Sequence, residues 1–224
     1  MRQLIKEVQA LIRKEIVLEW RQRYALNGML LYVISTVLIC YMSFSLSAGG
    51  IEKPTWNALY WIILLFAAVN AVAKSFVQER YGRFLYYYTL VSPQGIILSK
   101  IVYNAILMVV LSLVGYGFYS LMLDNPVEDH FLFVLTILLG AAGFSTTLTM
   151  VSGIASKAGN NSVLMAILSF PVIIPMLLML MKVSKNAMDG LERAASSDEI
   201  LTLASINLIV STLSYILFPY LWRS

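Results

Sequence analysis

The sequence predicts an all-α integral membrane protein, in which six transmembrane helices follow an N-terminal amphipathic helix. Hydrophobic residues make up 59% of the chain and charged residues only 12%, a balance far from that of a soluble domain. The apolar residues gather in six segments of about 19 to 23 residues, each long enough to cross a hydrocarbon core of about 30 Å as a helix. The segments are Ala25–Ser47, Ala58–Phe76, Ile101–Leu123, His130–Ser152, Val163–Met181 and Ile200–Leu221.

The charged residues lie between these segments and divide unequally between the two sides of the membrane. With the N-terminus in the cytoplasm, the inner side holds twelve basic and four acidic residues, and the outer side holds four basic and eight acidic residues. The excess of Lys and Arg on one side sets the orientation of a membrane protein. We therefore predict that both termini face the cytoplasm.

Three simple features narrow the class of protein further. The single cysteine, Cys40, excludes a disulfide within the chain. The leader of 24 residues carries three glutamates and precedes a long apolar run, which indicates an uncleaved anchor rather than a signal peptide. The chain has no Gly-x-x-x-x-Gly-Lys-Ser/Thr phosphate-binding loop, so energy for driven work would come from an ion gradient or from a partner.

Residues 1–24 form the first element, a predicted amphipathic helix on the cytoplasmic side. Apolar side chains recur at helical spacing from Leu4 to Trp20, and polar ones fill much of the opposite arc. Such a helix lies in the membrane interface. Two interpretations remain open: a lipid-anchored start that orients the protein, or an elbow helix that packs beside a cytoplasmic partner.

The rest of the chain, 25–224, is predicted to be one six-helix transmembrane domain, and its cytoplasmic loop at 77–100 is the most informative connection. Aromatic residues between Phe84 and Tyr88 are too many to be left exposed without a covering surface. The pair Ser92–Pro93 predicts that a helix restarts there. We expect two short helices joined by a bend, and the alternative is an aromatic belt at the membrane interface. The residues of interest are Phe76, Glu79, Arg80, Gly82, Arg83, Ser92, Pro93 and Lys100.

Polar residues inside the spans are few, and none in the middle of the membrane is acidic. This argues against a proton- or sodium-coupled transporter, which usually needs an intramembrane carboxylate. We interpret Asn70, Asn104 and the hydroxyl-bearing fourth span as groups that pack helices together, and Lys74 as a residue near the inner interface. Pro171 and Pro175 are expected to bend the fifth span.

The outer side has one longer loop, at 182–199, whose four acidic and three basic residues are interpreted as a solvated face. The only histidine, His130, is expected at the outer end of the fourth span. A role in holding haem or a metal has no second ligand to support it. We therefore expect no metal site and no cofactor bound by this chain.

The chain resembles the membrane subunit of type-2 ABC exporters, and more closely the CcmB family, haem exporter protein B of cytochrome c maturation. Three stretches carry this resemblance over nearly the whole chain. They are Phe76-x-x-Glu79-Arg80-x-Gly82 with Ser92–Pro93 and Lys100, Leu138-Leu139-Gly140-x-x-Gly143-Phe144, and Leu168-Ser169-Phe170-Pro171-x-x-Ile174-Pro175.

The resemblance implies a multi-pass subunit of the bacterial inner membrane that is not itself an enzyme. Two copies would pair with two copies of a CcmA-like ATPase, and CcmC-like and CcmD-like membrane proteins would join them. ATP hydrolysis on the partner would be linked to haem delivery and to release of a haem-loaded CcmE-like chaperone in the periplasm. The segment from Phe76 to Pro93 would dock on the ATPase, with Glu79 and Arg80 fixing its orientation and Gly82 permitting the bend.

Three alternatives remain open at this point. The chain could be an exporter permease for a lipid, drug or glycan, an integral membrane haem-handling enzyme, or a scaffold without energised motion. The genes that surround it, haem bound to the purified subunit, and co-purification with an ATPase would distinguish them.

Overall fold

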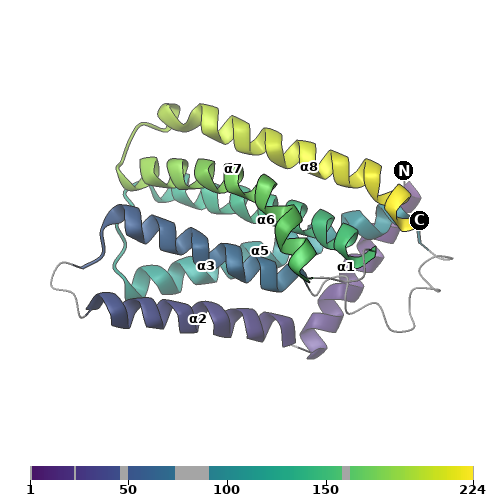
Figure 1. The fold of residues 1–224 in the computed structure, drawn as a ribbon, viewed down its shortest axis with the longest axis horizontal. Coiled ribbons are helices and arrows are strands. Elements are labelled where there is room, and N and C mark those ends of the chain that lie inside the picture. The colour runs from purple at the N-terminus through teal and green to yellow at the C-terminus, as the bar shows by residue number, and fades with distance from the viewer. Residues whose placement is uncertain (1, 23, 46–49, 74–90, 158–161, 224) are drawn as a thin grey trace.

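A computed structural model of the chain describes residues 2–22, 24–45, 50–73, 91–157 and 162–223, and nearly all of them are helical (Figure 1). No strand occurs among these residues. The helices are α1 (Arg2–Gln22), α2 (Tyr24–Ser45), α3 (Lys53–Ala73), α5 (Pro93–Met122), α6 (His130–Lys157), α7 (Ser162–Met188) and α8 (Ser197–Arg223), with a short 3-10 helix at Arg193–Ser196.

Six of these helices are long and apolar enough to cross a membrane, namely α2, α3, α5, α6, α7 and α8. This confirms the predicted fold class. These six helices run side by side along the bundle, whereas α1 runs across one end of it (Figure 1). The N- and C-termini lie close together at that same end, which we call the terminal end. The outer connections of the sequence prediction lie at the opposite end.

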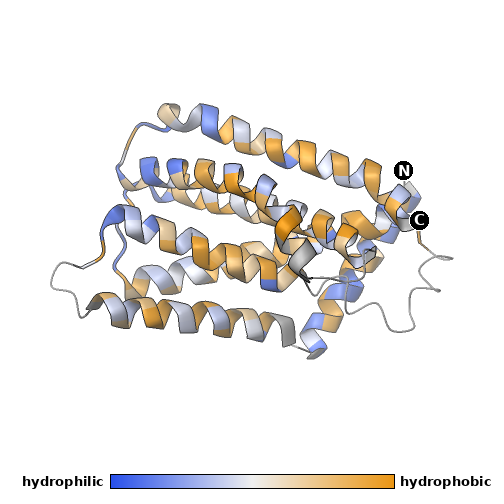
Figure 2. Cartoon of the chain, viewed as in Figure 1, coloured by the Kyte–Doolittle hydropathy of each residue, from blue (hydrophilic) through white to orange (hydrophobic). Residues whose placement is uncertain are grey.

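Hydropathy follows this arrangement. Figure 2 shows apolar residues along the middle of the long helices, on their outer faces as well, and polar residues gathered near the helix ends. A helix whose surface is apolar on every side is typical of a membrane span. The most buried spans are α6 and α3, and the least buried are α2 and α8. In this bundle α6 packs against α3, α5, α7 and α8.

The start of α5 shows why the third span is longer than its apolar stretch. Ser92 is the N-cap of α5, and its Oγ accepts a hydrogen bond of 3.2 Å from the backbone N–H of Gly95. Pro93 occupies the first helical position, where its fixed φ suits a helix and its missing N–H is not needed. The predicted restart is therefore a true helix start, and residues 93–100 are the first two turns of α5.

An aromatic cluster joins α3, α5 and α6 near the opposite end of the bundle. Trp56 and Tyr119 pack edge to face with their ring centroids 4.6 Å apart, and Phe133 lies 5.9 Å from Trp56. The polar tips are satisfied: Tyr119 Oη donates to the carbonyl of Trp56 at 3.0 Å, and Trp61 Nε1 donates to Ser184 Oγ at 2.9 Å. Buried rings with paired N–H and O–H groups form a rigid core.

Two glycines let neighbouring helices approach α6 closely. A Cβ atom at Gly140 would lie 2.7 Å from Cζ3 of Trp61, and one at Gly143 would lie 2.7 Å from Oδ1 of Asn207 and would overlap Sδ of Met176. Such spacing leaves no room for a side chain. The glycines, with the hydroxyl-bearing residues beside them, therefore serve helix packing.

The prolines of the fifth span lie inside α7, which the structure describes as one helix from Ser162 to Met188. Both Pro171 and Pro175 lie on the exposed side of α7. In Figure 1 the helix changes direction along its length, as a helix with an internal proline does.

Candidate functional site

A row of carboxylates on α1 faces the beginning of α5. The three glutamates are separated by multiples of four residues, so they follow one side of the helix. Each of them contacts a different polar residue of α5. We call this contact the α1–α5 seam, and its members are Glu7, Glu15 and Glu19 on α1 and Ser92, Lys100 and Tyr103 on α5.

The first contact of the seam lies at the N-terminus of α5. Oγ of Ser92 donates a 2.7 Å hydrogen bond to Oε2 of Glu7, and the Ser92 backbone N–H lies 3.3 Å from the same oxygen. A carboxylate is stabilised there because the first N–H groups of a helix carry a partial positive charge. Glu7 thus ties α1 to the residue at which α5 begins.

The second contact is an ion pair inside the bundle. Nζ of Lys100 lies 3.9 Å from Oε1 of Glu15, and Nζ of Lys14 lies 2.9 Å from the same oxygen. Lys100 is only 3% exposed. A buried charge is costly unless it is paired, and Glu15 brings a carboxylate from α1 to Lys100.

The third contact joins three helices. Oε1 of Glu19 accepts a 2.7 Å hydrogen bond from the backbone N–H of Leu26, in the first turn of α2, and Oη of Tyr103 lies 3.4 Å from Oε2. Glu19 therefore caps α2 in the way that Glu7 supports the start of α5. Carboxylates of α1 fix the beginnings of two transmembrane helices.

Apolar side chains also pack α1 against α5, between the polar contacts of the seam. Leu11 lies on the same side of α1 as the three glutamates, and it packs against a buried cluster that also includes the end of α8. The cluster members are Ile96, Ile97, Ile101 and Phe218, and Val91 packs against them as well. On the other faces of α1, the apolar residues Ile5, Ile16 and Trp20 are exposed, which fits the predicted amphipathic helix.

The predicted coupling residues divide between the seam and a part of the chain that the structure does not describe. Ser92, Pro93 and Lys100 belong to the first turns of α5, where two of them contact glutamates of α1. The others lie outside the described residues, as does Lys74. They are Phe76, Glu79, Arg80, Gly82 and Arg83.

The glutamates of the seam were not identified as site residues from the sequence. The signal was present, because Glu7, Leu11, Glu15 and Glu19 recur every four residues. That spacing predicts a common side of a helix but not its neighbour, since the contact with α5 joins residues about eighty positions apart.

The intramembrane amides Asn104 and Asn70 differ in what they contact. Nδ2 of Asn104 donates to Oγ1 of Thr149 at 2.8 Å and so joins α5 to α6. Asn70 donates to the carbonyl of Phe66 in its own helix at 2.9 Å. The hydroxyl of Ser145 adds a further link from α6 to the carbonyl of Ile101 at 2.8 Å.

Replacing Thr149 with valine is expected to lower the free energy of unfolding by about 1 kcal/mol, because it removes the hydroxyl while it keeps the shape of the side chain. The amount of protein inserted into the membrane should not change. Thermal unfolding of the purified protein measures the first effect. Thr202→Val is the matched control, since Thr202 is exposed and donates within its own helix. An unfolding temperature equal to that of the wild type would contradict a packing role.

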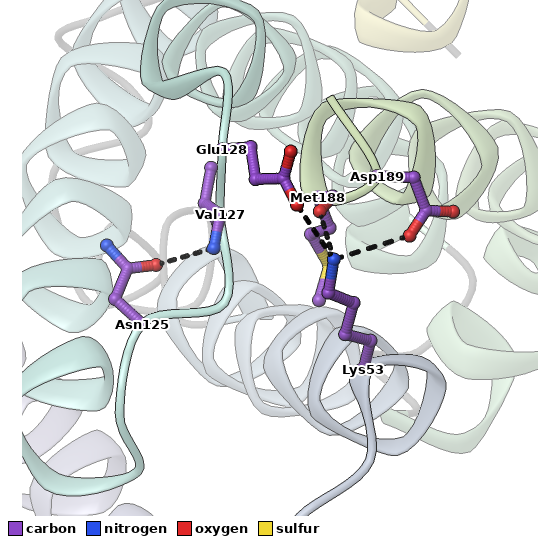
Figure 3. A network of polar contacts seen from close by, with 6 residues as sticks. All are labelled: Lys53, Asn125, Val127, Glu128, Met188 and Asp189. Atoms are coloured by element: carbon purple, nitrogen blue, oxygen red, sulfur yellow. Dashed lines mark hydrogen bonds and ion pairs between the residues drawn. The ribbon is translucent and has the colours of Figure 1, made fainter. Parts of the chain in front are cut away.

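At the opposite end, one ammonium group joins three parts of the chain (Figure 3). Nζ of Lys53, in the first turn of α3, donates to the carbonyl of Met188 at 2.6 Å and lies 3.2 Å from Oε1 of Glu128 and 3.6 Å from Oδ1 of Asp189. Glu128 belongs to the connection between α5 and α6, and Asp189 follows the end of α7. Lys53 therefore fastens these two connections to α3.

A second ion pair lies beside the first. The guanidinium of Arg193 contacts both carboxylate oxygens of Asp129, at 2.6 and 3.1 Å, and stacks over the ring of Phe131. The hydrogen bond from Arg193, with another from the backbone N–H of Leu132, holds the pKa of Asp129 below its ordinary value. Most of the predicted solvated face is exposed, although Glu199 is buried, and Asp189 and Arg193 pair with Lys53 and Asp129 in other parts of the chain.

Replacing Asp129 with asparagine is expected to lower the thermal unfolding temperature by about 2 °C at neutral pH. The pKa of Asp129 is depressed in the folded protein, so its stabilising effect is present above the ordinary carboxyl pKa and is lost as pH falls through the folded value. The difference between wild type and variant should therefore persist at neutral pH and disappear as pH falls below the ordinary carboxyl pKa and through the lower folded value. A difference that survives at lower pH would show that the carboxylate is not its source.

His130 is the first residue of α6 and is exposed, and its Nε2 lies 3.4 Å from Nδ2 of Asn125. Among the described residues, no group of three or more His, Cys, Asp or Glu side chains is placed to hold a metal ion. The expectation that this chain binds no cofactor itself stays a prediction.

Comparison with known proteins gives one result that covers most of the chain. The family model described as "CcmB protein" matches residues 6–218 of the 224 residues. No curated protein matches the chain. The match spans the seam, all six spans and the paired charges at the opposite end.

Proposed function

The chain belongs to the CcmB family, and on that premise we propose that it transmits the ATP-driven movement of a partner subunit across the membrane during cytochrome c maturation. Membership makes it a membrane component of a haem exporter and a permease subunit of an ABC transporter. Hydrolysis of ATP would take place on a CcmA-like subunit in the cytoplasm. The chain itself would carry out no chemistry.

The observation that supports this proposal best is the position of the α1–α5 seam. The segment from Phe76 to Pro93, which we propose as the docking site of the ATPase, ends where α5 begins, with Ser92 as the N-cap of that helix. Glu7 holds that residue and Lys100 contacts Glu15 two turns later. A displacement of the segment would therefore move α1 and α5 as one unit rather than α5 alone.

The wider assembly follows from the family. Two copies of this chain would pair with two ATPase subunits in the bacterial inner membrane, with both termini in the cytoplasm. CcmC-like and CcmD-like membrane proteins would join them, and a CcmE-like chaperone in the periplasm would carry haem away. ATP hydrolysis would drive the release of that haem-loaded chaperone, with haem as cargo rather than as a cofactor of this chain.

Replacing Glu79 and Gly82 with tryptophan tests the docking segment. We expect the variant to insert normally, but we expect ATP hydrolysis to be uncoupled from chaperone release, so that cytochrome c assembly fails. The measurements are the amount of protein in the membrane, co-purification of the ATPase, its activity, and the yield of c-type cytochromes. Glu192→Trp is a matched control, because Glu192 is exposed at the opposite end.

Two results would refute the proposal. The first is a variant at Glu79 and Gly82 that binds the ATPase and assembles cytochromes normally. The second concerns orientation: a cysteine placed at Tyr87 should react only with membrane-permeant reagents in intact cells. If an impermeant reagent labels it from the periplasm, the segment faces the wrong side for an ATPase.

A further inference from the structure

A cavity of about 550 Å³ lies between α1, α2 and α5, next to the third contact of the seam. Its walls are almost wholly apolar and include Ile106 and Val110, and the polar residues that line it are Glu19, Asn27 and Tyr103. Neither the docking segment nor the packing of the spans accounts for this space. It is separate from the part of the seam at Ser92, where α5 begins.

The two parts of the cavity lie at different depths along α5. Val110 is seven residues beyond Tyr103, which places it about 10 Å farther from the terminal end of the helix. The polar groups thus lie near the terminal end and the apolar wall lies toward the middle of the span. This is the polarity of a membrane lipid, with its headgroup at the interface and its acyl chain in the core.

The cavity is open to the side of the bundle. Ile106 is 47% exposed, Val110 is 45% exposed and Trp20 is 75% exposed. Since α2 and α5 are long and apolar enough to span a membrane, this side lies at the level of the bilayer. A tryptophan at such a position is typical of residues at headgroup level. A lipid can therefore enter from the bilayer without passing through the protein.

The charge of the cavity selects the headgroup. Of the described residues that line it, Glu19 is the one charged side chain, and its carboxylate already accepts hydrogen bonds from Leu26 and Tyr103. An anionic headgroup would meet this carboxylate unfavourably, whereas a primary ammonium would form a charge-assisted hydrogen bond with it.

We propose that this cavity binds an aminophospholipid of the surrounding membrane, with its ammonium at Glu19 and one acyl chain along Ile106 and Val110. The lipid would fill the space between α1 and α5 at the end of the seam that the Glu7 contact does not reach. This inference depends only on the position of these helices in a membrane. It does not require the proposed docking of an ATPase.

The test uses the full-length protein in nanodiscs and measures bound lipid by native mass spectrometry. With phosphatidylethanolamine and phosphatidylglycerol in competition, the wild type should retain phosphatidylethanolamine. Glu19→Gln should lose this preference by about tenfold, since a hydrogen bond to a charged group is lost. Val110→Phe should lose the bound lipid because the ring fills the cavity. Val114→Phe is the matched control, one turn further along α5, 49% exposed and outside the cavity.

Three outcomes would overturn the proposal. The first is a wild-type protein that takes phosphatidylglycerol as readily as phosphatidylethanolamine. The second is a Val110→Phe protein that retains as much lipid as Val114→Phe; if Val110→Phe does not fold, Ile106→Phe replaces it. The third is a crosslink to a polypeptide from a photoreactive benzoylphenylalanine at position 110 in native membranes, which would assign the cavity to a protein partner. A crosslinked adduct of lipid mass would support the proposal.

Discussion

Replacing Glu7 with alanine is expected to reduce cytochrome c assembly by about tenfold, while the protein still inserts into the membrane. The substitution removes the carboxylate that accepts a 2.7 Å hydrogen bond from Ser92 at the start of α5. A hydrogen bond to a charged group is worth about 2 kcal/mol, so its loss would separate the movement of α1 from that of α5. The yield of c-type cytochromes, normalised to the amount of inserted protein, measures the effect.

The partner residue gives this prediction an internal control. Ser92→Ala removes the same bond and also removes the cap of α5, so it should be at least as harmful as Glu7→Ala. The double variant should be no worse than Ser92→Ala, because both changes break one contact. Glu7→Gln keeps an acceptor and should lose less, and Gln9→Ala, on an exposed face of α1, should behave as wild type. Additive losses in the double variant would refute a shared contact.

Replacing Gly140 with leucine is expected to cost about 3 kcal/mol of stability and to lower the unfolding temperature by about 10 °C. Even a single carbon at this position would lie 2.7 Å from the ring of Trp61. That ring is fully buried and is held by its hydrogen bond to Ser184, so it has nowhere to move. Thermal unfolding and size-exclusion chromatography of the purified protein measure the loss.

Gly117→Leu is the matched control for this substitution. Gly117 is also in a transmembrane helix, but a Cβ atom there would have nothing within 4 Å. The side chain would extend from an exposed position of α5, so stability should stay unchanged or rise slightly. If both variants were equally unstable, general effects of leucine in these helices would explain the result, and the close contact of α6 with Trp61 would not.

The fold class was predictable because the length of each apolar segment can be read directly from the sequence. Segments of sufficient apolar length give the six spans, and Ser92 with Pro93 marks the start of α5 through local backbone chemistry. These signals depend on neighbouring residues alone. The predicted boundary at Ile101 nevertheless missed the first two turns of α5, because Lys100 and the residues before it are less apolar than the span that they begin.

The seam was not predictable because it depends on how distant segments meet. Lys100 was expected to take part in the cytoplasmic surface, yet α1 covers it and Glu15 contacts its ammonium group. The paired charges at the opposite end have the same character, since Arg193 and Asp129 are 64 positions apart. Composition indicates that such charges exist, but only the arrangement of the helices determines which of them pair.

The ammonium group of Lys53 has a mechanical consequence. It fastens the beginning of α3 to the connection between α5 and α6 and to the end of α7, so this end of the bundle can act as a pivot. A force applied at the terminal end would then spread the helices there while their opposite ends remained together. Since Glu128 and Asp189 are partly open to solvent, added salt would screen their attraction to Lys53 and loosen the pivot.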